Sequence, residues 1–123
     1  MRFLILAVAA MFATPAAAQI GNNQATTVVG SALSVGSPGY LQGINVTSGA
    51  SAGYVLVFDA AAVPADGVVT PARCMPLAAN TGLELNWRAS PINFRTGMIV
   101  VFSTTGCFTK TASATAFIAV DYR

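Results

Sequence analysis

The strongest constraint on the fold of this chain is its succession of short apolar runs, which show almost no helical periodicity. Residues 53–59 and 98–103 are the clearest runs, and both are rich in β-branched and aromatic residues. Turn-forming residues flank them, at 48–51 before the first and at 104–106 after the second. Runs of this length and composition, bounded by Gly, Ser and Thr, are typical of β-strands.

The same pattern predicts seven strands in the chain. They are residues 26–35, 40–47, 53–59, 73–77, 83–88, 98–103 and 115–122. Residues 60–71, which contain two prolines and an Asp-Gly pair, are expected to form a connecting loop. Short strands spaced by turns predict an all-β fold, a single antiparallel β-sandwich of the jelly-roll or immunoglobulin-like type.

Residues 1–18 have the features of a cleaved signal peptide. Arg2 precedes an apolar run at 3–12, and small residues at Ala16 and Ala18 fit cleavage after Ala18. The apolar run is shorter than the roughly 20 residues that a membrane-spanning helix needs; an uncleaved anchor or a buried helix is the alternative. We therefore expect a β-sandwich domain at 19–123, located in the periplasm or outside the cell, without stable membrane insertion after cleavage.

Charged residues are scarce. They make up 8% of the chain, against roughly 25% in an average soluble domain. The basic residues after the signal peptide are dispersed, which argues against a phosphate-tracking surface for nucleic acid or a polybasic membrane patch. They are Arg73, Arg88, Arg95, Lys110 and Arg123.

Two cysteines, Cys74 and Cys107, are the only ones in the chain. In an exported protein such a pair is normally oxidised, and a disulfide closing this loop would stabilise the fold by about 4 kcal/mol in the chain-entropy model. Two buried free thiols are the alternative. The chain has no His and no further Cys to complete a metal site, so no metal and no cofactor are expected.

The lack of His also excludes Ser-His-Asp and Cys-His catalysis. The remaining candidates for a hydrolase are a Ser-Lys pair, formed by Lys110 with Ser103 or Ser113, and a carboxylate pair. Lys110 is interpreted instead as a solvating charge in a Thr-rich turn, and the protein is predicted not to be an enzyme. The four carboxylates are Asp59, Asp66, Glu84 and Asp121.

Binding is the alternative to catalysis, and a carbohydrate-binding module is one form of it. Trp87 shares a strand face with Leu83 and Leu85, which favours a place in the core over a sugar-stacking platform. Tyr122 is expected to be exposed. Threonines that recur at even spacing near residue 110 would place their hydroxyls on one strand face. The possible ligand contacts are Trp87, Tyr122, Thr109 and Thr111.

Both faces of strands 53–59 and 98–103 are apolar. An antiparallel sandwich usually leaves one face of each sheet polar, so something is expected to cover the second face. Loop 60–71 would do so within one molecule, whereas a symmetry mate would do so in a homo-oligomer. A homo-oligomer or a partner in the cell envelope is therefore predicted.

Residues 44–117 resemble small, uncharacterised exported β-sandwich proteins of proteobacteria. The segments that carry this resemblance are 53–67, 71–80 and 96–111. The chain also looks like phage-encoded β-sandwich proteins, some of which decorate virions, although an export signal departs from that case. The resemblance brings no catalytic residues. It implies an exported protein that acts by binding or assembly.

Overall fold

The computed structural model describes residues 22–25, 30–35 and 38–123. In this part of the chain there is no helix, and eleven strands follow one another. They are β1 (Asn22–Ala25), β2 (Ala32–Val35), β3 (Gly39–Ser48), β4 (Gly53–Asp59), β5 (Gly67–Val68), β6 (Arg73–Leu77), β7 (Gly82–Asn86), β8 (Ile92–Phe94), β9 (Met98–Ser103), β10 (Thr109–Lys110) and β11 (Ala116–Tyr122). The predicted signal peptide lies outside the described residues.

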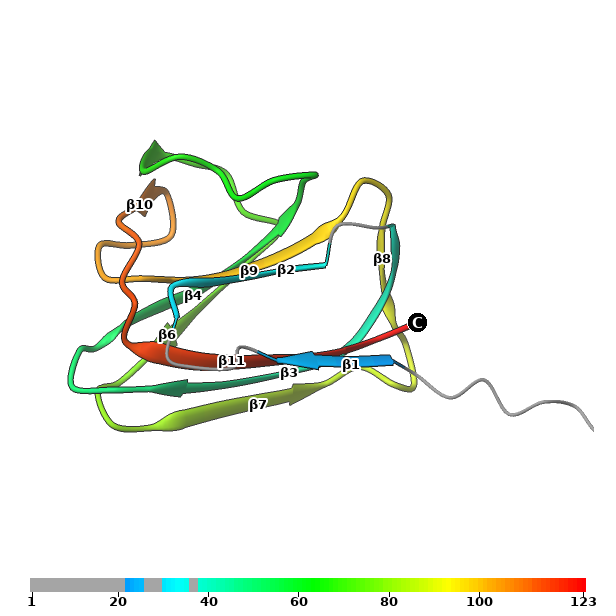
Figure 1. Ribbon diagram of the computed structural model, residues 1–123, viewed down its shortest axis with the longest axis horizontal. Coiled ribbons are helices and arrows are strands. Elements are labelled where there is room, and N and C mark those ends of the chain that lie inside the picture. Colours follow the sequence, from blue (N-terminus) through cyan, green and yellow to red (C-terminus); the bar gives the residue numbers. More distant parts are fainter. Residues whose placement is uncertain (1–21, 26–29, 36–37) are drawn as a thin grey trace, which may run out of the picture.

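The strands form two antiparallel sheets that pack face to face (Figure 1). Sheet 1 has the order β1-β11-β3-β7, and β8 also pairs with β3. Sheet 2 has the order β2-β9-β4-β6. A separate two-stranded ribbon, β5 with β10, lies beyond sheet 2, on the side away from sheet 1. The predicted all-β sandwich is confirmed.

The pairing order distinguishes the two predicted topologies. β1 pairs with β11, β2 with β9, β3 with β7, and β4 with β6. When the short β5, β8 and β10 are left aside, the first four strands pair in reverse order with the last four, as in one long hairpin folded over into two sheets. This is the jelly-roll arrangement of eight strands. The strand count exceeds the seven predicted because β1 and the short β5, β8 and β10 lack a clear apolar run.

The main core lies between the two sheets. Strands of both sheets contribute the side chains that alternate toward the inside, as expected for a two-residue period. In β3, Ile44 and Val46 are buried, and in β11 Ile118 and Val120 are buried. The cluster also contains Leu33, Val35, Leu41, Val55, Val57, Leu77, Phe94, Met98, Val100, Phe102 and Ala116.

A second apolar cluster covers the outer face of sheet 2. Leu56 and Phe58 from β4 pack there with Ile99 and Val101 from β9, and Val69 lies over them. Val69 belongs to a cap that we define as residues 60–72 and 104–112, which include β5 and β10. The predicted loop therefore covers the second face within one molecule, so a symmetry mate is not required to bury it.

Three links hold the cap in place. Cys74 and Cys107 form a disulfide with Cα atoms 5.6 Å apart, as predicted. Lys110 is buried and forms an ion pair with Asp66. The backbone N–H of Val69 donates to the carbonyl of residue 108 at 3.0 Å, which joins the two halves of the cap. The disulfide indicates an oxidising compartment.

None of the described residues belongs to a helix long and apolar enough to cross a membrane.

The disulfide should contribute substantially to stability. We expect the double variant Cys74→Ser/Cys107→Ser to lose about 4 kcal/mol of unfolding free energy, because the unfolded chain regains the entropy of the opened loop. Urea unfolding of the variant and of the wild type, both without reductant, measures this difference. Equal midpoints with equal slopes would show that the cap is held by its other contacts alone.

Candidate functional site

The two outer faces of the sandwich differ. The cap covers that of sheet 2, whereas no described element covers that of sheet 1 (Figure 1). We call this second surface the open face. Its residues are mostly polar or small: Asn23, Gly43, Asn45, Thr47, Glu84, Asn86, Phe117, Ala119 and Asp121.

The open face is hollowed by a shallow depression of about 370 Å³. Small residues on the two central strands make room for it, Gly43 on β3 and Ala119 on β11. A Cβ at Gly43 would lie 3.1 Å from the carbonyl oxygen of Leu85 and 3.5 Å from Oδ2 of Asp121. The absence of a side chain at Gly43 thus leaves space for the Asp121 carboxylate.

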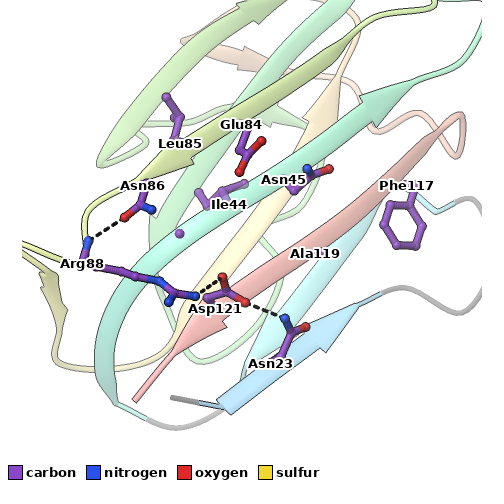
Figure 2. Close-up of a pocket in the computed structure, with 11 residues that line it drawn as sticks. Asn23, Ile44, Asn45, Glu84, Leu85, Asn86, Arg88, Phe117, Ala119 and Asp121 are labelled. Carbon is purple, nitrogen blue, oxygen red and sulfur yellow. Dashed lines mark hydrogen bonds and ion pairs between the residues drawn. The ribbon is translucent and has the colours of Figure 1, made fainter. Parts of the chain in front are cut away.

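A chain of polar contacts runs along one side of the depression (Figure 2). Asn23 Nδ2 donates to Asp121 Oδ1 at 2.5 Å, and Arg88 Nη2 lies 3.3 Å from Asp121 Oδ2. The backbone N–H of Arg88 donates to Asn86 Oδ1 at 2.9 Å. An ion pair this exposed adds roughly 0–1 kcal/mol to stability. Its main effect is to orient the carboxylate and the guanidinium.

The other side of the depression is formed by Asn45, Glu84 and Phe117. Asn45 and Glu84 are direct cross-strand neighbours on β3 and β7, so their side chains lie next to each other (Figure 2). Phe117 on β11 is 40% exposed. The depression therefore offers amide, carboxylate and guanidinium groups together with one aromatic ring.

Asp59 lies away from the open face, and its carboxylate is bound by backbone N–H groups. It accepts hydrogen bonds from the backbone N–H groups of Thr96 at 2.8 Å, Arg95 at 3.1 Å and Gly97 at 3.2 Å. These bonds, that from Thr96 first, hold the pKa of the Asp59 carboxyl below its usual value of 3.8. Asp59 thereby fixes the turn between β8 and β9 to the end of β4.

Asp66 belongs to the cap. Its hydrogen bond from Lys110 is the main cause of its lowered pKa, and the backbone N–H of Ala112 adds to it. The interpretation of Lys110 as a solvating charge is wrong, because its side chain is only 3% exposed and is paired with Asp66. Ser103, one candidate partner for a Ser-Lys pair, instead accepts the backbone N–H of Thr111 at 2.9 Å.

The predicted ligand contacts are not brought together. Trp87 and Tyr122 are half-buried and pack against the main core. Thr109 and Thr111 are exposed on the cap, where Thr111 is hydrogen-bonded to the hydroxyl of Thr105. Of the four carboxylates, only Glu84 and Asp121 line the depression.

Sequence reasoning did not single out Phe117 as a binding residue. The signal was present in β11, where buried Ala116, Ile118 and Val120 alternate with the residues that face outward. The outward residues of a solvent-exposed sheet face are usually polar. A phenylalanine among them is unusual, and this identifies Phe117 as a candidate contact residue.

Among residues 22–25, 30–35 and 38–123, no group of three or more His, Cys, Asp or Glu could hold a metal ion. No family model, no curated protein and no solved structure matches this chain.

Stability should fall at low pH through Asp59 and Asp66. Both pKa values are lowered in the folded state, so their contribution is present above the unfolded value of about 3.8 and is lost as pH falls through the folded values. We expect the melting temperature to drop from about pH 5 downward, and Asp59→Asn to reduce that drop. Thermal unfolding monitored by circular dichroism measures both.

Glu84→Gln is the control for this titration, because the Glu84 carboxylate accepts no hydrogen bond from the described part of the chain. If Glu84→Gln flattened the pH profile as much as Asp59→Asn, the assignment to the turn would be wrong.

Proposed function

We propose that this protein is an exported, non-catalytic binding module whose open face takes an oligosaccharide. The single observation that carries the proposal is the uncovered depression, with small residues at its centre and hydrogen-bonding side chains around it. Export is supported by the disulfide and by the signal-like pattern of residues 1–18.

The chemistry of the depression suits a hydroxyl-rich ligand. Carboxylate and amide groups provide acceptors, and amide and guanidinium groups provide donors, for pairs of neighbouring hydroxyls. The exposed ring of Phe117 offers an apolar surface to the C–H face of a sugar. Because Asn23 and Arg88 already hold Asp121, less side-chain entropy is lost on binding.

The surroundings of the two carboxylates favour binding over catalysis. Glycoside hydrolysis requires a carboxylic acid whose pKa is raised, which normally needs an apolar or water-excluding pocket. Glu84 is exposed, and Asp121 is held by Arg88. Neither carboxylate therefore lies in the apolar or water-excluding pocket that a general acid needs.

Matched pairs of substitutions test the proposed site. We expect Arg88→Ala to weaken binding to a neutral oligosaccharide about tenfold, since a hydrogen-bonding charged group is lost, and Phe117→Ala to weaken it about threefold or more through the lost aromatic contact. The probes are defined glucan, xylan, mannan and N-acetylglucosamine oligomers. Isothermal titration gives the dissociation constants.

Arg95→Ala and Phe108→Ala are the controls, because both residues are exposed and neither lines the depression. These variants should bind as the wild type does. Equal losses in the site variants and the controls, or no binding to any of these oligomers, would contradict the proposal.

A further inference from the structure

The open face carries one carboxylate without a counter-charge. Asp121 is paired with Arg88 at 3.3 Å, so the charges of these two groups offset each other. Glu84 projects from β7 into the same depression. Within the described residues, no Lys or Arg nitrogen lies within 4.0 Å of its carboxylate.

The other two carboxylates, Asp59 and Asp66, lie away from the open face and do not add to its charge. Asp59 is bound to the turn between β8 and β9, and Asp66 to the cap on the other side of sheet 2. Among the described residues that line the depression, Glu84 is therefore the charged group on its side, opposite the Arg88–Asp121 pair. A ligand that places a cation there gains a favourable interaction, and one that places an anion there is penalised.

We propose that the ligand of the open face is an oligosaccharide that carries free amino groups, with an ammonium group seated between Glu84 and Asn45. This inference rests on the proposed function and names its substrate class. Asn45 is the direct cross-strand neighbour of Glu84, so an ammonium that donates to the Glu84 carboxylate also reaches the Asn45 amide oxygen once that amide turns its oxygen toward Glu84. An ammonium has three N–H donors, whereas an N-acetylated nitrogen has one donor and no charge.

The other groups that line the depression favour an amino sugar over a ligand that offers only a positive charge. The sugar hydroxyls use Asn23, Asp121 and Arg88 on the opposite side of the depression, and Phe117 contacts a ring face. A lysine-rich peptide would also satisfy Glu84, but it has neither the pairs of neighbouring hydroxyls that suit Asn23, Asp121 and Arg88 nor a sugar ring face for Phe117. The arrangement therefore favours an amino sugar over a basic peptide.

The test compares glucosamine oligomers with N-acetylglucosamine oligomers of equal length, at about pH 5.5, where primary amines are protonated and exposed carboxyl groups are mostly ionised. We expect the wild type to bind the amine form about two- to fivefold more tightly, the range of an exposed ion pair. Glu84→Gln should abolish this preference, because the glutamine amide keeps a hydrogen-bond acceptor but carries no charge. High salt should reduce the preference in the wild type.

Thr70→Lys is the matched control, because it changes the net charge by the same amount as Glu84→Gln but at an exposed position of the cap; it should keep the preference. Equal binding of the two oligomers by the wild type, or a preference that survives in Glu84→Gln, would overturn the inference while the proposed function stands. Equally tight, Glu84-dependent binding of an oligolysine peptide would also overturn it. If neither sugar oligomer binds and other neutral oligosaccharides do, the inference alone fails; if no oligosaccharide binds, both proposals fail.

Discussion

The cap over sheet 2 is the interaction on which the rest of the structure depends. Strands β4 and β9 are apolar on both faces, and without the cap Leu56, Phe58, Ile99 and Val101 would face water. Burial of each such side chain is worth about 1.5–3 kcal/mol. The cap is too short to form a core of its own, so the Lys110–Asp66 pair holds its two halves together and the disulfide fixes it to β6 of sheet 2.

The cap covers one outer face of the sandwich, and no described element covers the other. Strand β3 must be apolar toward the core, yet its outward residues Gly43, Asn45 and Thr47 are small or polar, and no other described layer covers this side of the sheet. Rigid strands hold these positions, which makes the spacing of the side chains more precise than loops would. The jelly roll thus separates the two apolar clusters, which lie between the sheets and under the cap, from the proposed binding surface on the outer side of sheet 1.

Sequence pattern was sufficient for the main apolar strands and the disulfide, but not for β1, the short β5, β8 and β10, or the site. Strand β9 is apolar throughout and its type follows from composition. The site instead depends on register, because Asp121 meets Gly43 and Asn45 meets Glu84 only through non-local pairing. Trp87 shares a strand face with Leu83 and Leu85, which favoured a place in the core, and it packs against the main core, whereas Phe117 faces outward in β11 near Ala119.

The few carboxylates of this chain have different surroundings in the structure. Most of the carboxylates have structural or orienting partners: Asp59 in a turn, Asp66 in the cap and Asp121 with Arg88. Glu84 is the carboxylate left without such a partner in the described chain. Long-range fields from a densely charged surface would obscure a single unpaired group, but here few other charges compete with it. A surface of this kind distinguishes ligands by local hydrogen bonds and one charge, which is a suitable basis for separating an amino sugar from its acetylated form.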